Sequence, residues 1–210
     1  VMYDDIIESH VFPFFANSYL LECGESNRFD QMTHAVLSTD RGREKAFATI
    51  LYPCYVKKQA MFTEGIMHVK ELHENHLALQ NNDIPVIEED ILDGCIRMPF
   101  VNKMSLIEYL HSRVNIDKAL LWGILKKINS FIEKSSCTVS DDENAIRYYA
   151  PHLDWGIILK RAYIELVGMN CFYENGQFCF FFFFYVRENY PAKYVLFRAI
   201  KYLYILLPRL

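Results

Sequence analysis

Residues 165–185, ELVGMNCFYENGQFCFFFFFY, are the stretch that decides the fold of this chain. The stretch begins with an acid, Glu165, and places Asn170 five residues later. An Asn-Gly pair follows at positions 175–176, between two apolar runs, and this is the strongest short-range signal for a two-residue β-hairpin turn. The sequence therefore predicts two antiparallel strands directly after the acid and the amide. The run of five phenylalanines at 180–184 is expected in one strand only if both of its faces are buried.

Upstream of this hairpin, residues 33–61 have the pattern of an antiparallel meander. Its expected strands are HAVLST, KAFATILY and CYVKKQAM, separated by TDRGRE and by the Pro-Cys corner at 53–54. A second hairpin is predicted in residues 84–101, because an Asp-Gly pair at 93–94 has the residues that a tight turn requires. A short strand after a helical turn is expected in residues 1–30.

Helices are predicted between and after these strands. Thr63 is a suitable N-cap for a helix that ends near Asn82, since apolar residues recur there at helical spacing. Ser105 and Glu108 form a capping box before LIEYLHSRV, and residues 116–133 have an amphipathic helical pattern.

Two further helices are expected towards the C-terminus. Asp154 is interpreted as the N-cap of a helix formed by WGIILKRAYIEL, and YVLFRAIKYLYILLPRL as a buried amphipathic helix. The polar segment SSCTVSDDEN at 135–144 is expected to be a loop.

Composition narrows the classes of function. A chain of 210 residues with 52% hydrophobic residues forms one domain or two small lobes that share a cleft. The formal net charge of −4 gives no basic surface for a nucleic acid, so we expect no nucleic-acid partner. Six cysteines without a C-x-x-C pair favour a reducing cytoplasm. Apolar runs are short or interrupted by Arg198 and Lys201, which predicts no transmembrane segment.

The order of these elements resembles that of a protein-kinase-like fold. Residues 93–110, DGCIRMPFVNKMSLIEYL, resemble the last N-lobe strand, the hinge and the first C-lobe helix of atypical kinases. NCFYENGQFCFF, followed by ENYPAKYVLFRAIKYLY, is similar to the kinase-like domains attached to bacterial methyltransferases and glycosyltransferases of surface-polysaccharide synthesis. The resemblance covers residues 14–205 and includes no intact nucleotide-binding string.

The resemblance implies an α+β, two-lobed fold that is short at its C-terminus. Residues 1–102 would form a small antiparallel-sheet lobe with one long helix, and residues 103–210 a mainly helical lobe with the catalytic-loop-like hairpin. The implied cofactors are ATP and Mg²⁺, and the implied partner is a fused or neighbouring methyltransferase or glycosyltransferase domain.

Site roles follow from the same resemblance. Lys58 would pair with nucleotide phosphates, the alternative being that Lys57 and Lys58 are solvated edge lysines. Glu71 is the preferred helix partner of Lys58, with Glu64 and Glu74 as alternatives. Glu165 would occupy the position of the catalytic aspartate, and Asn170 would present its amide oxygen to Mg²⁺.

One position departs from the expected pattern. The resemblance places a second metal-binding aspartate near Phe182, and a phenyl ring cannot ligate a metal. Glu188, six residues later, is the substitute ligand only if the strand ends early. We therefore expect a degenerate kinase, either a pseudokinase or a weakly active enzyme. The alternatives are an active ATP–Mg²⁺-dependent phosphotransferase acting on a sugar or glycan end, and a non-catalytic α+β interaction domain.

Other motifs do not support a different chemistry. His73 and His76 in H-E-N-H are three residues apart, whereas a zinc-binding H-E-x-x-H motif needs a spacing of four. The pair His152-x-Asp154 lacks an asparagine at the required distance. No glycine-rich string of the Rossmann type is present.

Overall fold

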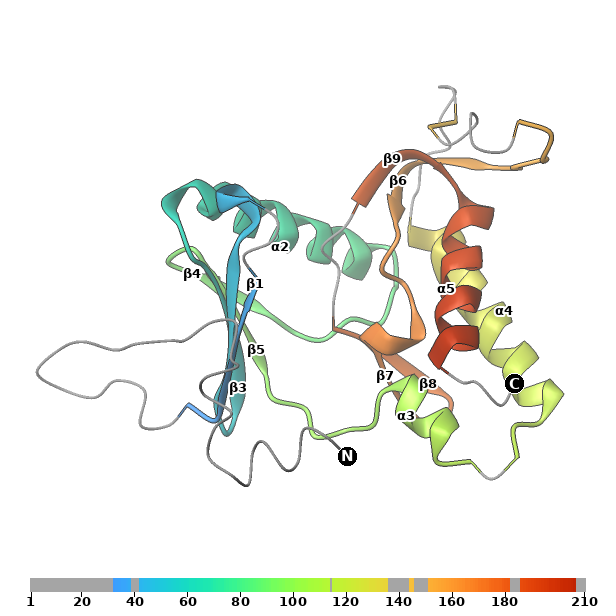
Figure 1. The fold of residues 1–210 in the computed structure, drawn as a ribbon, viewed down its shortest axis with the longest axis horizontal. Coiled ribbons are helices and arrows are strands. Elements are labelled where there is room, and N and C mark those ends of the chain that lie inside the picture. Colours follow the sequence, from blue (N-terminus) through green and yellow to red (C-terminus); the bar gives the residue numbers. More distant parts are fainter. Residues whose placement is uncertain are drawn as a thin grey trace, which may run out of the picture.

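The computed structural model describes residues 32–38, 42–113, 115–135, 144–145, 151–181 and 186–206 (Figure 1). The expectations for residues 1–30, for most of the loop at 135–144 and for Phe182 lie outside the described residues.

A five-stranded antiparallel sheet forms the N-terminal half of the structure. Its strands are β1 (His34–Ser38), β2 (Phe47–Leu51), β3 (Tyr55–Ala60), β4 (Asp90–Leu92) and β5 (Cys95–Pro99), in the order β1-β2-β3-β5-β4. Two 3-10 turns, η2 (Arg43–Lys45) and η3 (Thr63–Gly65), flank β2 and β3. The predicted meander and the hairpin at 93–94 are therefore confirmed, since Asp93 and Gly94 both have positive φ angles, of 47° and 72°.

Helix α2 (Ile66–Asn81) packs on this sheet through one side. Val69 and Leu72 of α2 join Ile96 and Met98 of β5 in an apolar cluster. The helix begins at Ile66 and not directly after Thr63, because Thr63–Gly65 forms the 3-10 turn η3.

In the C-terminal half, the described residues form three helices and two small antiparallel sheets. The helices are α3 (Leu106–His111), α4 (Lys118–Ser135) and α5 (Ala192–Leu206). Strands β6 (Ile158–Tyr163) and β9 (Val186–Pro191) form one sheet, and β7 (Cys171–Glu174) and β8 (Gln177–Phe180) form the other. A 3-10 turn, η5 (Gly168–Asn170), leads into β7. Figure 1 shows α4 and α5 side by side, at the opposite end of the molecule from the five-stranded sheet.

Local signals placed two of these elements correctly. Asn175 and Gly176 join β7 to β8 with φ angles of 50° and 81°, as a type I′ turn requires. The capping box before α3 is present, because the backbone N–H of Glu108 donates to Ser105 Oγ and the backbone N–H of Ser105 donates to Glu108 Oε2.

The helix predicted for WGIILKRAYIEL is wrong, because Ile158–Tyr163 within it forms strand β6. Leu159 and Ala162 are buried three residues apart, which imitates a helical spacing. The strand is stabilised by pairing with β9, in which Ala162 lies opposite Arg187. Asp154 is accordingly no helix cap: its Oδ1 accepts a hydrogen bond from the backbone N–H of Gly156 in a turn.

The β7–β8 hairpin lies between two apolar cores. Phe178 and Phe180 belong to the core formed with α3, α4 and α5, whereas Cys179 and Phe181 pack against the cluster of α2 and β5. Alternate residues of this segment thus enter different cores, as the two-faced geometry of a strand dictates. For residues 178–181, one face of the segment is therefore buried and the other is partly buried, so both faces pack against apolar side chains.

Polar contacts also join the two halves. The backbone N–H of Phe180 donates to Pro85 O, and that of Ile87 donates to Phe180 O, each at 2.8 Å. Arg161 of β6 donates to the side-chain oxygen of Asn75 on α2. The predicted α+β class with a small antiparallel-sheet lobe and a mainly helical lobe is confirmed. The boundary predicted at residues 102–103 falls in the connection between β5 and α3, and stays a prediction.

Among the described helices, none has both the length and the apolar character that a membrane crossing requires.

We predict that Phe180→Ala is among the most destabilising single substitutions. Phe180 is fully buried and packs edge-on against Phe131, with ring centroids 5.7 Å apart. Its removal should lower the free energy of unfolding by about 3–5 kcal/mol, because a cavity remains between the two cores. Phe197→Ala is the matched control, since Phe197 is 57% exposed, and it should change stability by no more than about 0.5 kcal/mol. Urea unfolding measures both, and equal losses would contradict the assignment of the core.

Candidate functional site

The loop between β6 and β7 brings Glu165 and Asn170 together. The side-chain amide of Asn170 donates to Glu165 Oε2 at 2.9 Å and to the backbone oxygen of Glu165 at 3.2 Å. The backbone N–H of Phe181 donates to the backbone oxygen of Asn170, which fixes the loop to the end of β8. The five-residue spacing of acid and amide thus closes a short, internally bonded loop.

Arg198 of α5 contacts the same loop at the other oxygen of the Glu165 carboxylate. Its Nη2 donates to Glu165 Oε1 at 3.2 Å, and its Nε donates to the backbone oxygen of Ile164 at 3.2 Å. Both side chains are largely buried, with exposed fractions of 21% for Arg198 and 16% for Glu165. Both carboxylate oxygens of Glu165 therefore have a partner within the protein.

The sequence analysis missed Arg198 as a site residue. Its signal was present, because a guanidinium within an apolar helix is costly to bury unless it is paired.

Lys58 is buried in the middle strand of the five-stranded sheet. It lies on β3 opposite Thr49 and Ile96, and only 6% of its surface is exposed. The alternative of a solvated edge lysine is therefore wrong for Lys58. Its role in binding nucleotide phosphates stays a prediction.

Glu89 is the acid whose ionisation responds to Lys58. The Glu89 side chain is 5% exposed, and its Oε1 lies 3.1 Å from His73 Nδ1. Burial raises the pKa of Glu89 to about 6, while the hydrogen bond and charge of His73 and the charge of Lys58 act in the opposite direction. His76 Nδ1 lies 3.5 Å from Glu89 Oε2, and burial, with the charge of His73, lowers the pKa of His76 to about 4. We call Lys58, His73, His76 and Glu89 the buried lysine cluster.

The structure does not pair Glu71 with Lys58 as expected. The Glu71 side chain is 61% exposed, and its carboxylate lies 2.9 Å from His68 Nδ1 on the same helix. The reason is the orientation of α2, which turns Val69, Leu72 and His76 inward and leaves Glu71 on its outer side. The sequence analysis missed Glu89, because it lies in the connection to β4 and not on the helix.

The described residues do not fit a Mg²⁺–nucleotide site at this loop. Magnesium in such sites is held by one or two carboxylates together with substrate phosphates. Glu165 is engaged by Arg198 and Asn170, which leaves the amide oxygen of Asn170 as the remaining side-chain donor of this pair. No group of three or more metal-ligating His, Cys, Asp or Glu side chains occurs in the described part of the chain.

Aromatic side chains cover the hairpin where it faces the five-stranded sheet. The rings of Phe172 and Phe181 lie 4.4 Å apart, and both pack against the cluster that contains Met98 of β5. The surface between the loop and the sheet is therefore apolar at these two positions.

With this geometry in place, comparison with known proteins defines the class of fold. The chain has a protein-kinase-like fold of the type found in aminoglycoside phosphotransferases, which confirms the fold predicted from the sequence. One solved structure to which it is similar is the streptomycin–ATP–APH(2″)-IIa ternary complex, with a TM-score of 0.50 and 9% sequence identity. The match covers 93% of this chain and 82% of that chain. No protein-family model matches the sequence, and a search of curated proteins finds no match. At this identity the likeness establishes the fold, not the activity.

The buried acid yields a pH-dependent prediction. Between pH 4.5 and about 6, the folded protein keeps a proton on Glu89 that the unfolded chain has lost. The resulting stability is present below pH 4.5 and is lost as the pH rises through the folded pKa. Relative to Glu89→Gln, the wild type should lose about 2 kcal/mol of unfolding free energy across this window.

Urea unfolding of both proteins at several pH values tests this difference. His76 has the opposite pH dependence, but it is present in both proteins, so its contribution is largely removed by the comparison. Glu71→Gln, on the exposed side of α2, controls for the loss of one negative charge. Parallel stability profiles for the wild type and Glu89→Gln would show that Glu89 does not titrate as described.

Proposed function

We propose that this chain is a kinase-like domain that does not transfer phosphoryl groups. In this proposal it is a pseudokinase that works as an interaction module in bacterial surface-polysaccharide modification, beside a fused or neighbouring methyltransferase or glycosyltransferase. We infer the absence of catalysis from Glu165, because both oxygens of its carboxylate are bonded within the protein, one to Arg198 and the other to Asn170. The biological setting rests on the sequence resemblance of residues 170–204.

A catalytic base must reach the proton of the substrate hydroxyl, at a distance of about 2.6–3.2 Å. Glu165 is one methylene longer than the aspartate that the resemblance expects, and one of its oxygens forms an ion pair with Arg198. These features support a structural role for Glu165.

The metal requirement supports the same proposal. Phosphoryl transfer depends on metal ions that bridge the phosphates and neutralise developing charge. Phenylalanine at position 182 provides no ligand atom, and the described residues near Asn170 do not complete a donor set. Losing several kcal/mol of transition-state stabilisation reduces a rate by orders of magnitude, at about 1.36 kcal/mol per tenfold.

A second candidate is an active ATP–Mg²⁺-dependent phosphotransferase that acts on a sugar or glycan end. The observation in its favour is the buried lysine cluster, in which Lys58 has an acidic neighbour in Glu89. A paired lysine of this kind is part of the phosphate-binding apparatus of kinases. ATP is present in the APH(2″)-IIa complex to which the chain is similar.

Thermal unfolding with ATP and MgCl₂ separates the two candidates. We expect the melting temperature to stay unchanged at millimolar nucleotide, with APH(2″)-IIa as the positive control. Binding at 100 times Kd would stabilise the fold by about 2.7 kcal/mol, which corresponds to roughly 5–10 °C for a chain of this size.

A rise in melting temperature of that size, abolished by Lys58→Met, would show that ATP binds through Lys58. It would count against the non-catalytic proposal and favour the active phosphotransferase. Phe182→Asp provides a further comparison, because it restores a carboxylate at the position where the resemblance expects one. We expect no Mg²⁺-dependent gain in ATP binding from this substitution, since Glu165 remains engaged by Arg198.

A further inference from the structure

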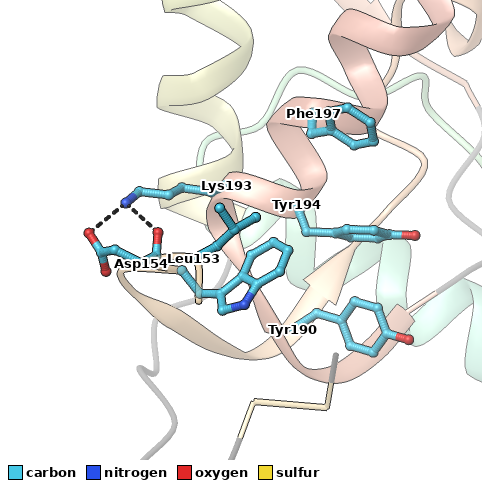
Figure 2. Close-up of a pocket in the computed structure, with 7 residues that line it drawn as sticks. Leu153, Asp154, Tyr190, Lys193, Tyr194 and Phe197 are labelled. Atoms are coloured by element: carbon cyan, nitrogen blue, oxygen red, sulfur yellow. Dashed lines mark hydrogen bonds and ion pairs between the residues drawn. The ribbon is translucent and has the colours of Figure 1, made fainter. Parts of the chain in front are cut away.

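An open pocket lies on the C-terminal half, away from the residues of the Glu165 loop and the buried lysine cluster. It is formed by the segment before β6, the end of β9 and the first turns of α5, and its volume is about 640 Å³ (Figure 2). This volume falls within the range of about 300–1,000 Å³ that is typical of small-molecule sites.

Four aromatic side chains dominate the lining of this pocket: Trp155, Tyr190, Tyr194 and Phe197. Tyr190 and Tyr194 pack edge-to-face, with centroids 5.3 Å apart, so each supports the position of the other. Phe197 is 57% exposed, whereas phenylalanine is among the residue types most often buried. Accessible aromatic surface gathered in a concave site is a mark of ligand binding.

Polar groups lie at two sides of this aromatic surface. Lys193 Nζ donates to Asp154 Oδ2 at 3.0 Å and to the backbone oxygen of Asp154 at 2.9 Å. Figure 2 shows this pair on one side, with the hydroxyl groups of Tyr190 and Tyr194 directed towards the other. The pocket thus combines an apolar surface with hydrogen-bonding groups at its edges.

The charges in the pocket restrict the ligand. Lys193 is the cationic side chain of the lining, and the carboxylate of Asp154 neutralises it. This pair is exposed, so an anionic ligand such as a nucleotide would have to compete with Asp154 for Lys193, and a cation would have to compete with Lys193 for Asp154. The electrostatics therefore favour a neutral ligand.

We propose that this pocket binds a neutral saccharide. The C–H groups on one face of a pyranose ring carry partial positive charge and pack against the electron-rich faces of aromatic rings. The hydroxyl groups around the ring edge can bond to Lys193, Asp154 and the tyrosine hydroxyls, and hydrogen bonds to charged partners are the stronger ones. The inference goes beyond the proposed function and does not depend on whether the Glu165 loop is catalytic.

Saturation-transfer NMR tests the proposal with maltotriose, cellotriose and chitotriose as probes at millimolar concentration. We expect transfer to the C–H protons of at least one trisaccharide. Phe197→Ser and Tyr194→Ala should weaken that binding by about tenfold, a typical consequence of losing an aromatic contact. Tyr194→Phe keeps the ring and removes the hydroxyl, and should have a smaller effect.

Trp122→Ala is the matched control, because Trp122 is 61% exposed on α4 and does not line the pocket. Its saccharide binding should equal that of the wild type. Phe197→Ser alters an exposed side chain, so loss of binding in that variant cannot be attributed to unfolding once circular dichroism shows an unchanged fold.

The proposal is overturned if none of the three saccharides receives saturation, or if Phe197→Ser binds as well as the wild type. Preferential binding of AMP at the same residues would also overturn it, in favour of base stacking. ATP–Mg²⁺ binding is measured separately, so failure here is distinguishable from failure of the non-catalytic proposal.

Discussion

The ion pair between Arg198 and Glu165 is the interaction on which the C-terminal half of the structure depends. Arg198 reaches from the apolar helix α5 to the Glu165 carboxylate and to the backbone oxygen of Ile164. Removing one member of such a largely buried pair leaves the other charge without compensation. The pair therefore fixes the loop against α5, and the bond from Asn170 to Glu165 extends this constraint to the start of β7.

The β7–β8 hairpin, which follows this loop, packs against both the C-terminal core and the apolar cluster of the five-stranded sheet. Phe178 and Phe180 fill the C-terminal core, while Phe172 and Phe181 pack against the N-terminal cluster. In the N-terminal half, Lys58 and Glu89 form a second buried polar group with His73 and His76. Three side chains with implied kinase roles are bonded within the protein: Glu165 to Arg198, Asn170 to Glu165, and Glu71 to His68. This supports the proposal of a kinase-like fold maintained for a non-catalytic purpose.

The fold was predictable where local chemistry determines it. Asn175-Gly176 and Asp93-Gly94 need positive φ angles, and Ser105 with Glu108 specifies a helix start, so these elements could be identified from a few adjacent residues. Strand β6 could not, because its pairing partner β9 lies beyond the β7–β8 hairpin in the sequence. The site was predictable only in part for the same reason. The contact between Glu165 and Asn170 is local, whereas Arg198 and Glu89 reach the predicted residues through tertiary packing.

The central claim is that Glu165 serves the fold through Arg198, and a double-mutant cycle measures that interaction directly. Urea unfolding of Glu165→Ala, Arg198→Ala and the double variant should give a coupling energy of about 2 kcal/mol. The exposed pair of Lys103 and Glu174 is a control, since its side chains are 52% and 57% exposed and should couple by less than about 1 kcal/mol. A coupling energy between Glu165 and Arg198 within about 0.3 kcal/mol of zero would contradict the account.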